Sequence, residues 1–220
     1  DREFYLSLSD RKCEVLDLGC GTGLLDEAFA KRGHIVTAVD PSQEMLHIAQ
    51  LKRAHQNINY VNSSAQEFRT DKTYDLIIMT GHAFQVLMTD ADVLMVFDTM
   101  KRHLKPNGLI VFESRNQKIN WAERWNYDMI LQLSGYQVRE LRRFSHWKHD
   151  VLHFDFIFEF PDEVIRTESK IRFWSRNEIE KHLSYAGFQI ESFYGDWERS
   201  TFNENISEEM IFLLRLKNKI

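Results

Sequence analysis

Three glycines at alternate positions, directly after a short apolar segment, are the part of this sequence best suited to chemistry. Residues 15–25 read Val-Leu-Asp-Leu-Gly-Cys-Gly-Thr-Gly-Leu-Leu. The apolar residues are typical of a buried strand, and the glycines let the backbone turn tightly and approach a ligand before a helix expected over Leu24 to Arg32. A dinucleotide-binding loop requires G-x-G-x-x-G, whereas the third glycine comes one place earlier here. The loop therefore predicts a cofactor site that does not hold a pyrophosphate.

An acidic residue follows this loop at the distance typical of a ribose-binding carboxylate. His34 to Val39 predicts a second strand, which ends at Asp40, about twenty residues after the loop. At this position of a nucleotide-binding α/β unit, a carboxylate accepts hydrogen bonds from both ribose hydroxyls. The order of strand, glycine loop, helix, strand and acid therefore favours a cofactor that contains a nucleoside.

The two motifs resemble those of the class I S-adenosylmethionine (SAM)-dependent methyltransferases. Residues 17–23 (Asp-Leu-Gly-Cys-Gly-Thr-Gly) are similar to the family's first motif, and residues 39–42 (Val-Asp-Pro-Ser), with Met45 one turn further on, are similar to the second. After the third expected strand the family usually has an acid followed by alanine, and here Ser64 replaces that acid. Ser64 is expected either to contact the cofactor or to cap a short helix, and Gln66 or a backbone carbonyl to take the adenine amino group.

The resemblance implies that SAM is the cofactor, with the glycine loop at its amino acid end and Asp40 at its ribose. The cofactor-binding residues predicted on this basis are Asp17, Gly19, Cys20, Gly21, Thr22, Gly23, Asp40, Pro41, Met45, Ser64, Ala65, Gln66, Thr80 and Gly81.

The segment that follows the expected strand Tyr74 to Met79 carries the candidate for acid–base chemistry. Residues 80–85 (Thr-Gly-His-Ala-Phe-Gln) lie at the carboxyl end of a strand, where ligands bind in open α/β sheets, and resemble the family's fourth motif, which lies between methyl donor and acceptor. His82 is the candidate general base, since histidine titrates near neutral pH. Alternatively, alignment of donor and acceptor supplies the rate without a base. The predicted substrate contacts are His82, Phe84, Arg115, Trp121 and Trp147.

Arg115 leaves the fifth expected strand at the same edge of the sheet. Its guanidinium is suited to binding a substrate carboxylate through two parallel hydrogen bonds, and the alternative is an ordinary surface arginine.

Apolar strands alternate with amphipathic helices along most of the chain, which predicts an α/β fold. We expect a doubly wound, mostly parallel seven-stranded sheet with helices on both faces, within a single domain over residues 1–220. The family resemblance implies that the last strand runs antiparallel. The expected strands cover 15–18, 34–39, 57–62, 74–79, 109–113, 188–194 and 210–216, and the expected helices 24–32, 43–54, 91–104 and 175–186, the last with a Ser175–Glu178 capping box.

Residues 119–174 interrupt this rhythm and predict an antiparallel β insertion after the fifth strand. Val151 to Phe160 alternates apolar and polar side chains, and Tyr136 to Phe144 and Val164 to Phe173 are its expected neighbours in a three-stranded sheet. The insertion holds twelve of the chain's 28 aromatic residues, so it forms either a lid over the acceptor or part of the main core. Its histidines, His146, His149 and His153, lack metal-ligand spacing, so no metal is expected.

Composition favours a small-molecule acceptor. The formal net charge of −5 offers no global attraction to nucleic acid or anionic membranes. The absence of a long apolar run or a signal-peptide pattern, with only Cys13 and Cys20 as cysteines, predicts a cytoplasmic protein. Cys20 is expected to be a small loop residue rather than a nucleophile.

The expected function is in-line transfer of a methyl group to an N, O or C atom. The alternatives are a non-catalytic SAM-binding protein and a nicotinamide-dependent oxidoreductase, and the glycine spacing opposes the second of these.

Overall fold

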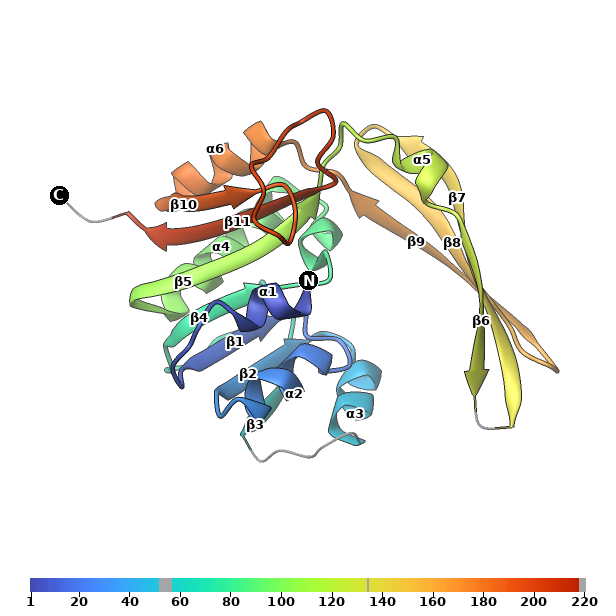
Figure 1. The fold of residues 1–220 in the computed structure, drawn as a ribbon, viewed down its shortest axis with the longest axis horizontal. Helices are drawn as coiled ribbons and strands as arrows, with labels where there is room; N and C mark the ends of the chain where they lie inside the picture. Colours follow the sequence, from blue (N-terminus) through green and yellow to red (C-terminus); the bar gives the residue numbers. More distant parts are fainter. Residues whose placement is uncertain (52–56, 134, 218–220) are drawn as a thin grey trace.

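Two β-sheets organise the chain in the computed structural model, which describes residues 1–51, 57–133 and 135–217. The larger sheet has seven strands in the order β10-β11-β5-β4-β1-β2-β3 (Figure 1). All neighbouring pairs are parallel except those that β11 makes with β5 and β10. The predicted doubly wound seven-stranded fold, with an antiparallel last strand, is therefore confirmed.

Six of the seven strands lie within about one residue of the ranges expected from the sequence, whereas β5 begins at Leu104, five residues before its expected start. The seven strands are β1 (Glu14–Leu18), β2 (Ile35–Asp40), β3 (Ile58–Asn62), β4 (Tyr74–Met79), β5 (Leu104–Arg115), β10 (Phe188–Tyr194) and β11 (Glu209–Leu216). The helices are α1 (Arg2–Leu6), α2 (Leu24–Lys31), α3 (Gln43–Leu51), the 3₁₀ turn η1 (Ala83–Val86), α4 (Asp90–His103), α5 (Trp121–Arg124) and α6 (Arg176–Ala186). Residues 52–54, the end of the second expected helix, lie outside the described residues.

Both faces of the seven-stranded sheet are buried. On one face α4 and α6 pack against side chains such as Leu16 and Phe112, and on the other α1 and α2 pack against Val15 and Val111. Strands covered on both faces carry nearly continuous apolar runs, which is why their positions could be read from the sequence. The helix α6 begins at the predicted Ser175 capping box.

The second sheet has four antiparallel strands in the order β6-β7-β8-β9 and extends away from the body at the right of Figure 1. They are β6 (Tyr127–Leu133), β7 (Tyr136–Lys148), β8 (Val151–Glu159) and β9 (Val164–Arg172). The expectation of three strands was wrong because it missed β6. This edge strand is mostly exposed and has no clear alternation of apolar and polar residues, so it carries no strand signal.

The extended sheet has a small hydrophobic cluster of its own. The cluster consists of Trp121, Trp125, Leu152, Phe154 and Phe173. Trp174, the last residue of the predicted insertion, is instead buried in the core of the body, where its indole N–H donates to the Leu87 carbonyl at 3.1 Å. The structural boundary between sheet and body therefore falls between Phe173 and Trp174.

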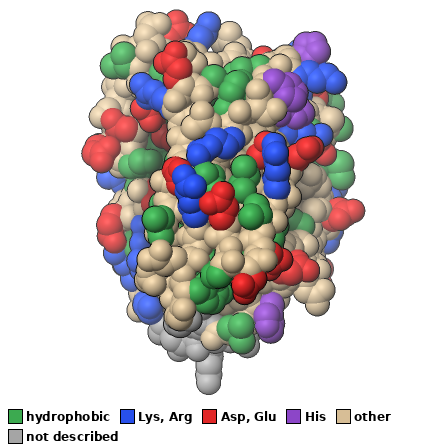
Figure 2. All heavy atoms as spheres, turned by 90° about the vertical axis from the view of Figure 1, so that its right-hand side faces the viewer, with side chains coloured by type: hydrophobic (Ala, Val, Ile, Leu, Met, Phe, Trp, Pro, Cys, Tyr) green, Lys and Arg blue, Asp and Glu red, His purple; other side chains and the backbone are tan. Residues whose placement is uncertain are grey.

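Charged side chains of both signs are interspersed with hydrophobic ones on the face shown in Figure 2. Within the four-stranded sheet, Arg139 pairs with Asp128 and Arg166 with Asp155, each at 2.6 Å. Among the described residues, no helix has the length and apolar character needed to cross a membrane.

Candidate active site

A cavity of about 310 Å³ lies at the carboxyl ends of β1 and β4, beside the glycine loop. Five predicted cofactor residues line it, namely Asp17, Cys20, Thr22, Thr80 and Gly81. The remaining lining residues come from the start of α2 and from the N-terminal segment, which the sequence did not single out: Leu24, Leu25, Asp1, Arg2 and Tyr5. The structure thus brings the first and fourth motifs together around one space, as predicted for the edge of such a sheet.

The glycines of the loop adopt the left-handed backbone conformation that other residues avoid. The φ angles are +87° at Gly19, +54° at Gly21 and +73° at Gly23. A Cβ atom at Gly19 would lie 2.9 Å from the Cβ of Ala83, whereas one at Gly21 or Gly81 would meet no atom within 4 Å. Gly19 therefore lets the loop pack against η1, and Gly21 and Gly81 leave open space beside it.

Asp40 fastens the glycine loop to the end of β2. Its Oδ2 accepts a hydrogen bond from the Gly21 N–H and its Oδ1 from the Ser42 N–H, both at 2.8 Å. A carboxylate with two backbone donors is held firmly, since hydrogen bonds to charged groups contribute about 1.5–3 kcal/mol each. The contact of Asp40 with a ribose stays a prediction.

The residues predicted near the adenine do not line this cavity. Ser64 caps the turn that follows β3, because its Oγ accepts from the Glu67 N–H at 3.2 Å. The Gln66 carbonyl accepts from the Thr99 hydroxyl at 3.2 Å, and Ala65 is buried in the core. Met45 is largely exposed, as is Pro41. Their cofactor contacts stay predictions.

Two buried carboxyl groups lie side by side at the cavity, Asp17 in its lining and Asp26 behind it. Asp17 is 1% exposed and Asp26, from the first turn of α2, is 0% exposed. Burial and mutual proximity raise the pKa of Asp17, and burial raises the pKa of Asp26 to about 7. Burial and these acids also raise the pKa of the Cys20 thiol, which keeps it protonated and disfavours a nucleophilic role.

His82 lies between two glutamates, Glu113 and Glu209. Its Nε2 lies 2.9 and 3.0 Å from the two carboxylate oxygens of Glu209, the first residue of β11. Its backbone N–H donates to Glu113 Oε1 at 2.8 Å, and its φ of +61° is rare for a residue with a side chain. These contacts hold His82 in an unfavourable backbone conformation. Residues in such conformations occur most often at functional sites.

Glu113 connects this histidine to the N-terminal helix. Its Oε2 accepts a hydrogen bond from the Tyr5 hydroxyl, and Tyr5 also lines the cavity. Burial raises the pKa of Glu113, while the neighbouring His82 opposes that shift. Hydrogen bonds therefore link Tyr5 to Glu113, Glu113 to the His82 backbone, and the His82 ring to Glu209.

Arg115 packs between a glutamine and two tryptophans. The Arg115 Nη1 donates to Gln85 Oε1 at 3.0 Å, and its guanidinium lies 5.5 and 5.2 Å from the ring centres of Trp121 and Trp125. Burial lowers the pKa of Arg115. Arg115 also lies opposite Glu209, the partner of His82, in the pairing of β5 with β11. Its binding of a substrate carboxylate stays a prediction.

Two predicted substrate contacts fall elsewhere. Phe84 is 0% exposed and stacks on Phe112 with ring centres 4.5 Å apart, so η1 directs its side chain into the core, and its contact with a substrate stays a prediction. Trp147 packs edge-on against Phe173 and lines a different cavity of about 350 Å³, together with Lys118 and His149.

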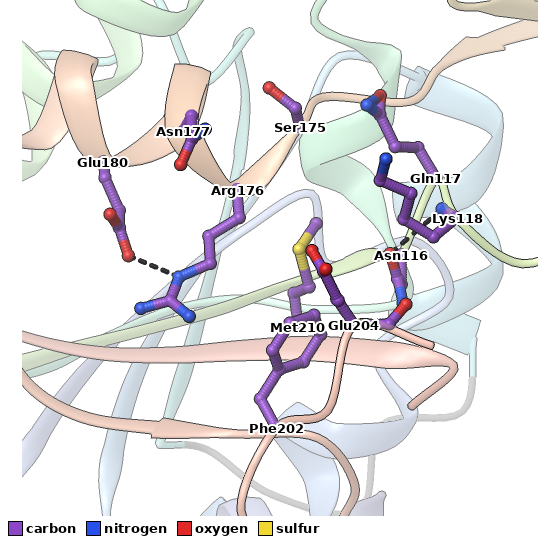
Figure 3. Close-up of a pocket in the computed structure, with 10 residues that line it drawn as sticks. All are labelled: Asn116, Gln117, Lys118, Ser175, Arg176, Asn177, Glu180, Phe202, Glu204 and Met210. Atoms are coloured by element: carbon purple, nitrogen blue, oxygen red, sulfur yellow. Dashed lines mark hydrogen bonds and ion pairs between the residues drawn. The ribbon is translucent and has the colours of Figure 1, made fainter. Parts of the chain in front are cut away.

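A larger cavity, of about 430 Å³, opens between the start of α6, residues 116–118 and the loop before β11 (Figure 3). Its lining includes Arg176 and Glu180, which pair with each other at 2.6 Å. None of its described lining residues belongs to the predicted site, so the smaller cavity beside the glycine loop is the candidate cofactor site.

Comparison with known proteins identifies the same segment. Residues 15–108, which contain the glycine loop, Asp40 and His82, match the family model described as a methyltransferase domain. Over this segment the chain is similar to SAM-dependent methyltransferases, as its two motifs predict. It is 30% identical over 172 residues to the ubiquinone biosynthesis O-methyltransferase of Bradyrhizobium diazoefficiens, an alignment that covers 75% of this chain and 61% of that protein. The chain spans about half the length of the curated relatives it matches.

Solved structures of class I methyltransferases share the fold of nearly the whole chain. A SAM-dependent methyltransferase from Clostridium acetobutylicum superposes with a TM-score of 0.85 at 21% identity, covering 99% of this chain and 91% of that one. SAM-bound CalS10, an amino pentose methyltransferase from Micromonospora echinaspora, superposes with a TM-score of 0.71 at 18% identity, covering 96% and 86%. The four-stranded sheet therefore accompanies the methyltransferase body in other members of this fold.

Several residues of this methyltransferase site escaped sequence reasoning. Asp26, Glu113 and Glu209 contact predicted residues, and Tyr5 lines the cavity and donates to Glu113, but all four lie outside the recognised motifs. The sequence does contain one signal for the acidic ones. They lie at the ends of apolar strands or in the first turn of an apolar helix, where burial of an unpaired charge costs free energy and therefore indicates a partner.

Proposed function

We propose that this chain is a SAM-dependent methyltransferase that transfers a methyl group to an N, O or C atom of a small-molecule acceptor by direct in-line displacement. The observation that carries the proposal is the cavity itself, with open space beside Gly21 and Gly81 and with Asp17, whose buried Oδ1 has no hydrogen-bond partner in the described part of the chain. An orphaned buried carboxyl oxygen beside a glycine-lined space fits a ligand that carries an ammonium group.

The residues present fit SAM in three places. Asp17 would hold its ammonium group, the loop around Gly21 would lie against its amino acid end, and Asp40 would accept from its ribose hydroxyls. When bound, SAM supplies a methyl group activated by a sulfonium. The protein's part is to align an acceptor atom with that methyl group and to exclude water, which supplies much of the rate of such a displacement.

His82 is the group that takes the acceptor's proton in this proposal. Because its Nε2 is engaged by Glu209, the tautomer with a hydrogen on Nε2 is favoured, and Nδ1 is left as a proton acceptor. Glu209 is a positioning residue that orients the ring and stabilises the charged imidazole after proton transfer. The Glu113 contact to the His82 backbone fixes the loop that carries the ring.

The four-stranded sheet completes the site in this proposal. Residues 119–173 serve as a lid over the acceptor within a single domain over residues 1–220, with Trp121, Trp125 and Arg115 forming its wall beside His82. The net charge of −5 and the intermixed surface charges support a small acceptor rather than nucleic acid. A cytoplasmic location is supported by the two cysteines, Cys13 and Cys20, both of which are free.

Two measurements test this function. Calorimetry with SAM and with NAD should show binding of SAM alone, since the loop does not suit a pyrophosphate; the reverse result would favour the oxidoreductase alternative. Incubation of the protein with methyl-labelled SAM and a pool of small metabolites should then label an acceptor. Tight SAM binding without transfer to any acceptor would favour the non-catalytic alternative.

A further inference from the structure

The two buried carboxyl groups at the cofactor cavity lack the hydrogen bonds that buried acids require. Apart from the contact between the two acids themselves, Asp17 Oδ1 and both carboxyl oxygens of Asp26 accept no hydrogen bond of normal geometry from the described part of the chain. The two groups lie close enough to share a proton, and buried like charges in contact do not both ionise. Without a ligand, the pair therefore retains a proton at neutral pH.

The other ionisable groups near the pair do not relieve this deficit. Asp40 from β2 and Glu113 from β5 add negative charge toward Asp17. The Cys20 thiol, kept protonated by burial, is a weak donor that lowers the pKa of Asp26, and the Tyr5 hydroxyl donates to Glu113, so neither supplies a positive charge. The guanidinium of Arg2, which lines the mouth of the cavity, is exposed and makes no ion pair among the described residues. The pair thus lies in a buried acidic environment with no cation of its own.

We propose that Asp26 joins Asp17 in a two-carboxylate subsite for the ammonium group of SAM, and that binding of this ammonium group releases the proton shared by the pair into solution. This inference rests on the proposed function, because it concerns how SAM is held. Asp17 lines the cavity and meets the ligand, and Asp26 acts behind it from α2. Asp26 lies three residues after the last loop glycine, at a position that would otherwise suit an apolar residue facing the core.

Proton release gives the site a defined dependence on pH. Below neutral pH the proton competes with the ammonium group, so SAM affinity rises with pH, by up to about tenfold per pH unit for one whole proton released. Above about pH 8 the α-amino group of the ligand itself loses its proton, and the affinity stops rising. The expected optimum for binding therefore lies near pH 7.5.

Isothermal titration calorimetry of the full chain tests the inference without any measurement of activity. Titration with SAM at pH 6.5 in two buffers of different ionisation enthalpy should show release of about one proton per SAM bound. Titration with 5′-methylthioadenosine, which lacks the amino acid end, should show none.

The Asp26→Asn variant separates the two carboxyl groups. The amide keeps the size of the side chain and donates a hydrogen bond to Asp17, so Asp17 ionises without a ligand. We expect proton release to fall near zero, and SAM to bind at pH 6 at least as tightly as to wild type. Glu27→Gln is the matched control, since Glu27 is the next residue of α2, is partly buried and pairs with Lys31 rather than with the cavity residues; it should behave as wild type.

The outcomes are distinguishable from failure of the proposed function. If wild type binds no SAM at any pH, the proposed function falls. If SAM binds with no proton exchange and with an affinity that is constant between pH 6 and 7.5, the two-carboxylate subsite is wrong while the function stands. The subsite is equally wrong if Asp26→Asn remains folded, by circular dichroism, and releases as many protons as wild type.

Discussion

The Nε2 atom of His82 lies within 3.0 Å of both carboxylate oxygens of Glu209, 127 residues away in the chain. The antiparallel strand β11 makes this contact possible, because it enters the sheet next to β5 with Glu209 opposite Arg115. The reversed last strand thus delivers an acidic side chain to the edge at which the fourth motif places its histidine.

This relationship predicts that Glu209→Gln slows methyl transfer without weakening SAM binding. The amide does not stabilise a charged imidazole, so kcat should fall roughly tenfold, against about 10²–10⁴-fold for His82→Ala. The loss should appear in kcat, measured at saturating SAM, while calorimetry shows an unchanged affinity for SAM. Glu208→Gln is the control, since Glu208 pairs with Arg124 on the surface. A kcat for Glu209→Gln that matches wild type would remove Glu209 from the mechanism.

Replacement of Asp40 by alanine should weaken SAM binding by about tenfold to a hundredfold, equivalent to the loss of one or two charge-assisted hydrogen bonds. The structure adds a second reason, because Asp40 accepts from the Gly21 and Ser42 N–H groups and holds the loop in place. Calorimetry measures the affinity, and Glu44→Gln, in the exposed first turn of α3, is the control. An unchanged affinity would place the ribose elsewhere.

The glycine loop, the acid after β2 and all seven strands of the main sheet could be predicted because each is encoded in a short segment. The apolar run of residues 74–79 is typical of a strand that is covered on both faces. The G-x-G-x-G spacing is typical of a tight loop in which these positions have positive φ angles. The partners of the site could not be predicted in this way. Glu209 and Tyr5 reach it by packing of segments far apart in the chain, and Asp26 is an ordinary residue in the first turn of a helix until its burial is known.

Valine at position 21 should abolish SAM binding. The backbone there has φ +54°, and the side chain would fill the open space beside the cavity. Gly33→Val is a matched control, because Gly33 has φ +87° and equally open surroundings but lies outside the site. Both variants should lose stability through backbone strain, about 1–3 kcal/mol, and only Gly21→Val should lose binding. A folded Gly21→Val protein that binds SAM normally would contradict the assigned loop.

The Asp17–Asp26 pair should make the ligand-free protein less stable as pH rises. The pKa of Asp26 is about 7 in the folded protein against an ordinary value of 3.8, so the folded state binds more protons than the unfolded state between these values. Stability contributed by this group is therefore present below about pH 4 and lost as pH rises to 7. Thermal unfolding from pH 4.5 to 8 should show a smaller loss for Asp26→Asn than for wild type. Parallel curves for the two proteins would refute this linkage.

Removal of the four-stranded sheet should separate cofactor binding from transfer. Replacing residues 119–173 by a short glycine-serine linker takes away the sheet together with its own cluster of Trp121, Trp125, Leu152, Phe154 and Phe173, while it keeps Trp174, which belongs to the core of the body. The residues that line the cofactor cavity all lie outside the deleted segment. We therefore expect SAM affinity within a few-fold of wild type and no methyl transfer.

The alternative is that the sheet is needed for the body to fold, since Arg172 donates to the Met88 carbonyl and its own carbonyl accepts from Gln85. The Gln85→Ala variant of the full chain serves as a control, because it removes one of these contacts and leaves the sheet in place. If the deletion protein aggregates or melts far below this control, the sheet is part of the structural core. A deletion protein that is folded and still transfers methyl groups would show that the acceptor binds on the body alone, because no lid residue would then be required to align it or to exclude water.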